Sequence, residues 1–492
     1  MSRTRTTLAL LATLAVVALG ADALARVGGG ESYGGGGGGG GGDGEGIGIL
    51  IELVFRLLFW LCLEHPVIGI PLTLAVVIGI IVVKARPTPV DIGQDLAHDV
   101  APAPRRRGSL VAEIEALRQH DPAFSRHLFL DFAALLYSRV QEARGDGPIE
   151  PVLPWLAPEA LAALDRSPDR VDRVIAGGIT LVGIHVGKQV RLTVTFEANV
   201  REHSGGTREL YLRERWTFER ALHVLSRSPE EITRLGCPSC GAAGELDVHG
   251  RCTFCHTAVN QGEVAWVVRR MEILERRDKR RLEVALSPGG VEPGTNDLTV
   301  MQPAFAAAQR AFFARNPAFT WAAFEERARG IFLALQDAWS TLDWERARPH
   351  ETDHLFQTHR YWIERYRSDG LRNVLADVRI DRVVPCRIEQ DAWFEAVTVR
   401  IFASMRDWVE DAQGRVVGGN RSVERSFSEY WTFIRRIGVA ERQDRSLANC
   451  PSCGAQLQVN AAAICAFCES KIAGGDFDWV ASLIEQDEAY RG

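Results

Sequence analysis

Cysteines are the residues of this chain whose type and spacing point most directly to chemistry. Eight of the ten cysteines form two quartets of identical spacing, each built from two Cys-x-x-Cys pairs. The quartets are Cys237, Cys240, Cys252, Cys255 and Cys450, Cys453, Cys465, Cys468. Two residues between thiolates let backbone amides turn toward the sulfurs, and two such pairs supply four soft ligands at tetrahedral angles. The spacing therefore predicts two bound zinc ions, with iron in a rubredoxin-like site as the alternative.

All four ligand positions of each quartet are protein sulfurs, so no position stays open for water and we expect the zinc ions to be structural. His256 follows Cys255, but Glu469 stands in the same place of the second quartet, so His256 is interpreted as a bystander. Cys62 and Cys386 lie outside the quartets and are expected to be buried apolar side chains. No catalytic residue is predicted, and the sequence does not assign ligand-binding residues.

Three histidines form the remaining group with metal-ligand character. His350 and His354 are one helical turn apart, and His359 follows, with Glu351 and Asp353 between them. A solvated polar start of a helix explains this composition without a metal, and that interpretation is favoured here.

A carboxylate and a phenol close together could act as the acid–base pair of an enzyme. Asp131 and Tyr137 are the candidate pair, but Glu326 and Phe332 stand at the same offsets in the second part of the chain. Since the phenol is lost there, the sequence favours a non-enzymatic protein.

Past residue 108 the chain repeats itself, which is the pattern of a tandem duplication. Short marks recur in the same order: Asp121-Pro122-Ala123-Phe124 as Asn316-Pro317-Ala318-Phe319, Trp216-Thr217-Phe218 as Trp431-Thr432-Phe433, the first cysteine quartet as the second, and Trp266 as Trp479. We call the two copies the first and the second repeat.

Each repeat reads as helices followed by strands. Asp121 and Asn316 are predicted N-caps of a helix whose apolar side chains recur at steps of three and four residues. Strict alternation then predicts a half-buried strand over Val190–Val200 and another over Val397–Met405. The mixed charges of Arg269–Arg281 predict a solvated helix, with a lipid-surface contact as the alternative. The fold class expected is α+β, with helices against an antiparallel sheet.

The first hundred residues have a different character. Arg3, Arg5 and the apolar run to Leu19 are typical of a signal peptide or an uncleaved signal anchor, and a glycine-rich tether follows. The uncharged run Val67–Val83 predicts a membrane span, whereas Ile47–Leu63 carries Glu52 and Arg56 and is interpreted as an interfacial or re-entrant helix. A second span there would reverse the orientation expected below.

The distribution of charge predicts the orientation in the membrane and argues against a nucleic-acid partner. Lys84, Arg86 and the basic residues 105–107 follow the predicted span, so by the positive-inside tendency a single-pass inner-membrane protein would place its repeats in the cytoplasm. A reducing compartment disfavours disulfides between the quartet cysteines. The formal net charge of -6 offers no general attraction to nucleic acid, and no nucleic-acid partner is expected.

The second repeat resembles the Tim44-like family, the family named for the membrane-docking subunit of the mitochondrial import motor. The resemblance rests on Leu335-Gln336-Asp337-Ala338-Trp339, His354-Leu355-Phe356, Gly370-Leu371-Arg372-Asn373-Val374-Leu375 and Trp431-Thr432-Phe433. It implies a cone-shaped domain of the nuclear-transport-factor-two-like superfamily, membrane association and protein binding, with no enzymatic activity. Two such domains and two metal modules in one chain depart from the import subunit, so its docking role is not carried over.

These observations predict a membrane-anchored adaptor that binds a protein segment or lipid through two cone domains. An enzymatic or small-molecule-binding cone is the first alternative, and nucleic-acid binding through the zinc ribbons is the second. The expected segments are a signal peptide or anchor (1–25), a glycine-rich linker (26–46), a membrane segment (47–84), a Pro/Arg-rich linker (85–108), the first Tim44-like domain (109–232), a zinc ribbon (233–270), a linker helix and loop (271–300), the second Tim44-like domain (301–445) and a second zinc ribbon (446–484).

Overall fold

The computed structural model describes residue 27 and residues 107–490, with gaps at 146, 166–169, 204–205, 233–234, 279–289, 293, 442–448, 461–462 and 488–489. All described residues belong to one compact unit. The predictions for the signal segment 1–25, the membrane segment 47–84 and Cys62 fall outside them, as do nearly all of the two linkers 26–46 and 85–108. Among the helices of the described part, none combines the length and the apolar character that crossing a bilayer requires.

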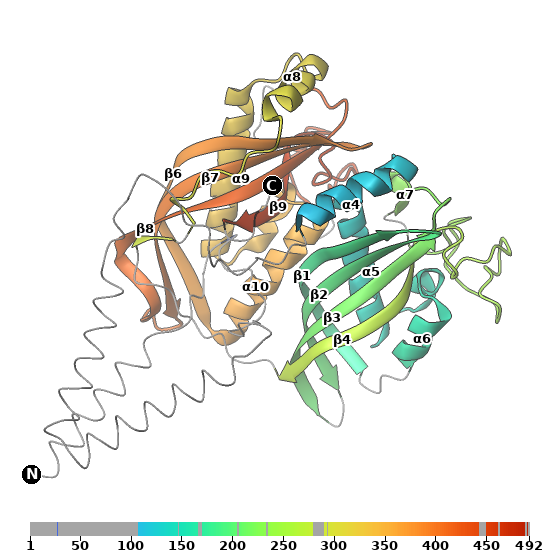
Figure 1. Cartoon of the computed structure of the whole chain (residues 1–492). Helices are drawn as coiled ribbons and strands as arrows, with labels where there is room; N and C mark the ends of the chain where they lie inside the picture. Colours follow the sequence, from blue (N-terminus) through green and yellow to red (C-terminus); the bar gives the residue numbers. More distant parts are fainter. Residues whose placement is uncertain are drawn as a thin grey trace, which may run out of the picture. The chain divides into compact units, whose positions relative to one another are not determined.

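The first repeat places its helices before its strands. The helical elements are α4 (Arg107–His120), α5 (Arg126–Ala143), the 3-10 helix η1 (Glu150–Trp155) and α6 (Pro158–Asp165). The strands are β1 (Arg170–Val186), β2 (Gln189–His203), β3 (Thr207–Ala221) and β4 (Val267–Asp278), with the short α7 (Pro229–Ile232) between β3 and β4. They form one antiparallel sheet in the order β1-β2-β3-β4 (Figure 1).

The second repeat follows the same plan. Its helical elements are α8 (Phe305–Arg315), α9 (Trp321–Ser340), η2 (Trp344–His350) and α10 (Asp353–Asp369). Its strands are β6 (Leu371–Gln390), β7 (Phe394–Asp411), β8 (Val416–Arg436) and β9 (Val480–Gln486), and β5 (Gly290–Val291) adds a short parallel pairing to β8. The predicted α+β class, with two sheets, is therefore confirmed.

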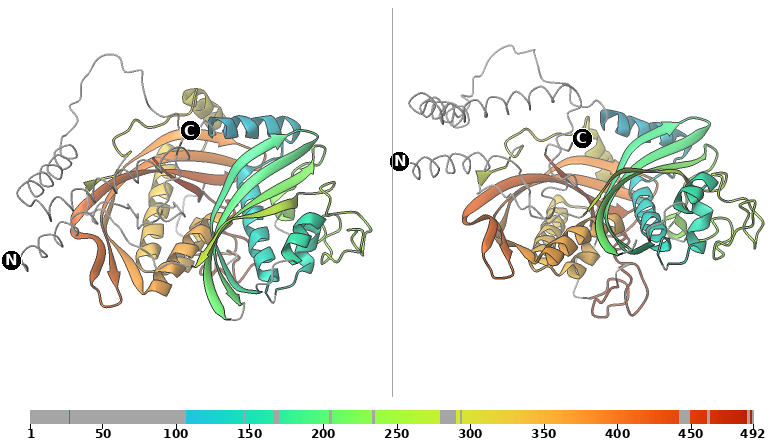
Figure 2. Two further views of the ribbon diagram at one scale, coloured as in Figure 1. Left: turned by 60° about the horizontal axis from the view of Figure 1, so that its bottom comes forward. Right: turned by 90° about the horizontal axis from the view of Figure 1, so that it is seen from below.

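The side chains predicted to face inward are buried in both strands, but only β2 is half-buried as predicted. In β7 the opposite face is buried as well, since Arg400 is 1% and Ser404 0% exposed. Val190, Leu192, Val194, Phe196, Ala198 and Val200 of β2 are each at most 2% exposed, and Val397, Val399, Ile401, Ala403 and Met405 of β7 at most 1%. These side chains share a core with the buried face of α5 in the first repeat and of α9 in the second. Figure 2 shows α5 against the first sheet and α9 against the second.

The helix starts are later than predicted. Asp121 and Asn316 are not N-caps, because α5 is capped by Ser125, which accepts from the Leu128 amide, and α9 by Thr320, which accepts from the Ala323 amide. Both residue types favour helix starts and buried polar contacts alike, so the local pattern could not separate the two roles.

The segment predicted as a solvated helix at Arg269–Arg281 is mostly strand β4, which pairs with β3 along Leu210–Glu219. Its charged side chains lie in cross-strand ion pairs such as Arg269 with Glu219, at 3.0 Å. The sheet of the first repeat thus extends past the boundary expected at residue 232, and the linker expected from residue 271 begins with the end of this strand.

Helix α10 belongs to the core of the second repeat but also packs along β1, the edge strand of the first sheet. Tyr361 donates a hydrogen bond to the Asn199 side chain at 3.1 Å, and Arg173 donates to Glu364 at 2.7 Å. Covering an edge strand with a helix is a common way to keep its backbone groups from pairing elsewhere. In the first repeat the corresponding helix is the much shorter α6.

Candidate metal centres

Both cysteine quartets are inserted between two strands that pair with each other. The first lies between β3 and β4, and the second between β8 and β9. Each repeat therefore leaves its sheet at the third long strand, forms the four-cysteine segment and returns to add the closing strand. The strands thus fix both ends of each cysteine segment.

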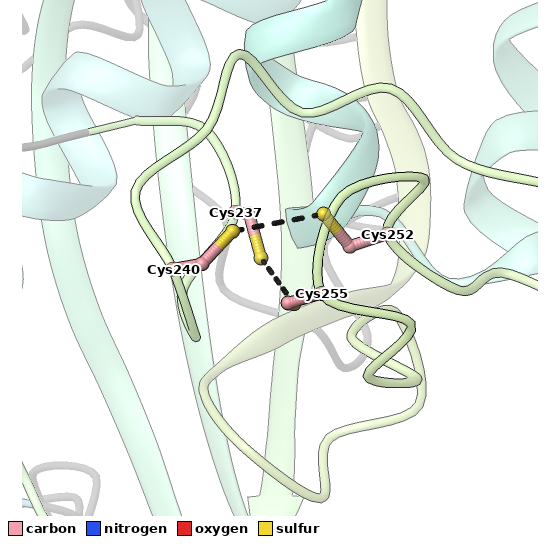
Figure 3. Close-up of side chains that lie close together, drawn as sticks. All are labelled: Cys237, Cys240, Cys252 and Cys255. Atoms are coloured by element: carbon pink, nitrogen blue, oxygen red, sulfur yellow. Dashed lines mark hydrogen bonds between the residues drawn. The ribbon is translucent and has the colours of Figure 1, made fainter.

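The four sulfurs of the first cysteine cluster converge (Figure 3). The Sγ atoms of Cys237 and Cys255 are 3.7 Å apart, those of Cys240 and Cys252 are 3.8 Å apart, and all four lie within 4.8 Å of one another. Cys237 and Cys252 are buried, whereas Cys240 is exposed.

The second cysteine cluster has the same arrangement. Its four Sγ atoms also lie within 4.8 Å of one another, with Cys450 and Cys468 at 3.8 Å. Cys450 and Cys465 are buried and Cys453 is exposed, so the burial pattern matches that of the first cluster position by position.

The local fold of each Cys-x-x-Cys pair explains why its sulfurs point the same way. The residue after each second cysteine is left-handed: Gly241 (φ 77°), His256 (φ 59°), Gly454 (φ 74°) and Glu469 (φ 60°). Its amide donates to the carbonyl of the first cysteine, at 2.8 to 3.0 Å in the four turns. The Ser239 and Phe467 amides also point at sulfur, at 3.4 Å from Cys237 and 3.5 Å from Cys465. His256 and Glu469 therefore occupy a turn position, and neither belongs to the converging ligand set.

Hydrogen bonds favour the thiolate form at the last cysteine of each quartet. The Thr257 hydroxyl and amide lower the pKa of Cys255 to about 6, and Ser470 lowers the pKa of Cys468 to about 6 in the same way. Burial raises the pKa of Cys237 to about 12. A metal cation would favour the thiolate at all four positions, since ligation requires deprotonation.

The spacing of the sulfurs fits a tetrahedral metal ion. A Zn–S bond of about 2.3 Å places tetrahedral sulfurs about 3.8 Å apart, close to the separations of 3.7 and 3.8 Å seen here. All eight cysteines are free thiols rather than disulfides. With four sulfur ligands a bound ion would have a closed coordination sphere, which stabilises a fold and leaves no place for substrate.

Sequence reasoning missed a buried arginine beside each cluster that stacks on a tryptophan ring and pairs with a carboxylate. We call this arrangement the brace. In the first repeat, the buried Arg220 at the end of β3 forms an ion pair with the buried Asp121 and lies over the Trp266 ring, 4.3 Å from its centre. Asp121 also accepts from the Ser226 hydroxyl at 2.7 Å. Burial lowers the pKa of Arg220, while Asp121 acts in the opposite direction.

The second repeat repeats this brace with one change of charge. Arg435 at the end of β8 lies 4.6 Å from the centre of the Trp479 ring and donates to the Asn316 side chain at 3.2 Å. Because Asn316 is neutral, other carboxylates pair with Arg435: the buried Glu395, at 3.1 Å, and Glu441. The signal was present in the sequence, since Trp-Thr-Phe is followed by x-Arg in both repeats.

A glycine near the end of each cysteine segment packs against the backbone of the brace arginine. Gly262 (φ 84°) and Gly475 (φ 78°) accept from the backbone amides of Ala221 and Arg436, at 2.8 and 2.9 Å. A Cβ atom at either glycine would approach the Arg220 or Arg435 Cα atom to 3.2 Å. The positive φ and the close approach together require glycine at these two positions.

The prediction of a solvated helix start at the histidine cluster is wrong, because two of its three histidines are buried. His354 and His359 are 3% and 1% exposed and face carboxylates: His354 Nδ1 lies 2.7 Å from Asp131, and His359 hydrogen-bonds to Glu351. Burial and the nearby Arg327 lower the pKa of His350 to about 3. The carboxylate partner of His354 comes from the first repeat, which no local pattern could indicate.

Asp131 and Tyr137 do not form the acid–base pair of an enzyme. Asp131 accepts from the His354 backbone amide at 2.9 Å and so faces α10, whereas Tyr137 stacks on Phe196 in the core, with ring centres 4.4 Å apart. Burial raises the pKa of Tyr137 well above its usual value. Cys386 is fully buried, as predicted.

Residues 305–445 match the family model of the Tim44-like domain. This confirms the resemblance seen in the second repeat, where the domain was expected at 301–445. The match begins at the first residue of α8 and ends before the second cysteine cluster. Among curated proteins, none matches the chain.

Proposed function

We propose that this chain is a membrane-anchored, non-enzymatic adaptor that binds a protein segment or lipid through two cone-shaped Tim44-like domains, each completed by a zinc ribbon. The observation that carries the proposal is the duplicated four-cysteine cluster, set between paired strands of a repeat whose second member matches the Tim44-like domain. A closed sulfur site and a family of adaptor domains are both consistent with binding rather than catalysis.

The first repeat supports the proposal as a second domain of the same kind. Its helices and strands follow the same order as those of the second repeat, and its Arg220–Trp266 stack has a counterpart in Arg435–Trp479. Helix α6 stands where the second repeat has α10, which accounts for the weaker sequence resemblance of the first repeat.

The membrane anchor in this proposal is residues 47–84, with the repeats on the cytoplasmic side of an inner membrane. Its support is the uncharged run Val67–Val83 and the basic residues that follow it. A cytoplasmic location also keeps the quartet thiols reduced and available to a metal.

Zinc content tests the structural part of this proposal. We expect the full-length chain, purified in detergent under reducing conditions, to contain close to two zinc ions, because each cluster offers four converging thiolates. Changing Cys237 and Cys450 to serine should lower the content toward zero, while Cys386→Ser should leave it unchanged. Elemental analysis by mass spectrometry measures the ratio. Freshly reduced wild-type protein without metal, or with iron, would refute the zinc assignment.

Capture from native membranes tests the adaptor role. We expect crosslinking of the tagged full-length chain to recover a specific protein partner or lipid, and a variant starting at Ser109 to recover much less, because it lacks the anchor that concentrates it at the membrane. The readout is the set of crosslinked molecules, identified by mass spectrometry. Equal recovery by both forms would argue against a role for the anchor, and turnover of a small molecule abolished by Asp131→Asn would favour the enzyme instead.

A further inference from the structure

We infer that the metal ion of the second cysteine cluster stabilises the contact of α10 with the first repeat, whereas the ion of the first cluster does not. The inference rests on the proposed zinc binding and adds a regulatory role to one of the two sites. Contacts on either side of the second cluster carry the argument.

Strand β9, which begins at Val480 and is the first strand after the second cluster, contacts the first repeat. The Ser482 hydroxyl of β9 lies 2.7 Å from His127 Nδ1 of α5, and both side chains are buried. The neighbouring Ala481 carbonyl accepts from the Thr352 amide at 3.0 Å, directly before α10 begins. The short strand β9 thus forms a hydrogen bond to the residue before α10 and also contacts the first repeat.

A second path leads from the cluster itself to α10. Lys471, three residues after Cys468, forms an ion pair with Asp353, the first residue of α10, and Asp353 also pairs with the buried Arg348. These two cations lower the pKa of Asp353 against the opposing effect of its burial. The charge is well placed, because a carboxylate at a helix N-terminus is stabilised by the helix dipole.

The start of α10 is in turn one of the places at which the second repeat contacts the first. Asp131 of α5 accepts from both the backbone amide and Nδ1 of His354, at 2.9 and 2.7 Å. Farther along α10, Tyr361 binds Asn199 of β2 and Glu364 binds Arg173 of the edge strand β1. Ordering of the second cluster is therefore connected to the whole α10 contact with the first repeat.

The first cluster has a counterpart of the strand connection but not of the ion pair, because Ala258 stands at the position equivalent to Lys471. The Val268 carbonyl of β4 accepts from the Ala157 amide at 3.0 Å, directly before α6 begins, as Ala481 accepts from Thr352. Helix α6 ends at Asp165 and packs on β4 of its own sheet. The duplication thus supplies an internal control, in which equivalent clusters are connected through a strand to the short α6 in one repeat and to α10 in the other.

Metal loss should therefore have different consequences at the two sites, because a ligand stabilises only the structure that is coupled to its binding. Losing the second ion frees Lys471 and β9, and the α10 contact with β1 and α5 should open more often. Losing the first ion should loosen β4 and α6 and leave the α10 contact closed.

The test compares two double variants of the full-length chain in detergent, Cys450→Ser with Cys453→Ser and Cys237→Ser with Cys240→Ser. Metal content and amide hydrogen exchange are measured on the same samples. Each variant should lose one ion. Exchange in α10, β1 and the start of α5 should rise at least about tenfold in the first variant and stay unchanged in the second.

Lys471→Met serves as a milder variant that keeps every cysteine. It should retain both ions and raise exchange at the start of α10 by up to about fivefold, as expected for one partly exposed ion pair. Unchanged α10 exchange in both the Lys471 variant and the metal-depleted second-cluster variant would overturn the inference while leaving the zinc proposal intact. Wild-type protein without metal would overturn the zinc proposal and the inference with it.

Discussion

Arg220→Ala is expected to destabilise the first repeat by about 3–5 kcal/mol, the cost typical of removing one partner of a buried ion pair. The side chains of Arg220 and Asp121 are each 1% exposed, so the alanine variant leaves a carboxylate buried without its cation. It also removes the cation from the Trp266 ring. Urea unfolding, followed by hydrogen exchange of peptides from β3 and β4, measures the loss in the first repeat separately from the second.

A double variant separates charge from packing. Adding Asp121→Asn to Arg220→Ala removes the uncompensated charge and should restore part of the lost stability, because the second repeat already carries Asn316 at this position. A single variant within about 1 kcal/mol of wild type would mean that water or another cation compensates Asp121, contrary to the buried arrangement described here.

Trp479→Ala is the second large effect, with an expected loss of about 3–5 kcal/mol in the second repeat, as for other fully buried large aromatic side chains. Trp479 is fully buried, and its ring meets Phe324 edge to face, with ring centres 5.1 Å apart. On its other side it supports the guanidinium of Arg435. The variant thus creates a large cavity and removes the seat of a buried cation, and thermal unfolding measures both together.

Trp408→Ala is the matched control for this substitution. Trp408 lies in β7 of the same repeat but is only partly buried, so its removal creates no closed cavity. We expect it to cost less than half as much. Equal losses for the two variants would show that burial at Trp479 is not what determines its contribution.

Local sequence patterns were enough to predict the structural features that depend only on residues close together in the chain. Alternation predicted the inward side chains of β2 and β7, and the Cys-x-x-Cys spacing predicted which sulfurs converge. In both cases the residues that decide the structure lie within one strand or one turn.

Features that depend on distant partners could not be predicted in this way. Asp121 suits a helix cap as well as an ion pair, and only Arg220, far along the chain, decides between them. The mixed charges of Arg269–Arg281 suit a solvated helix until β3 supplies a pairing edge. His354 becomes a buried residue because Asp131 of the other repeat provides its acceptor.

The position of the cysteine clusters between paired strands also bears on the order in which each repeat is completed. Chain entropy makes closure of the excursion from Ala221 to Val267 costly, but halving its free length saves only about 0.6 kcal/mol. The ion therefore contributes mainly by holding its own turns together. Since synthesis proceeds from the N-terminus, the cysteines of each repeat leave the ribosome before the last strand of its sheet, so metal capture can precede completion of the sheet.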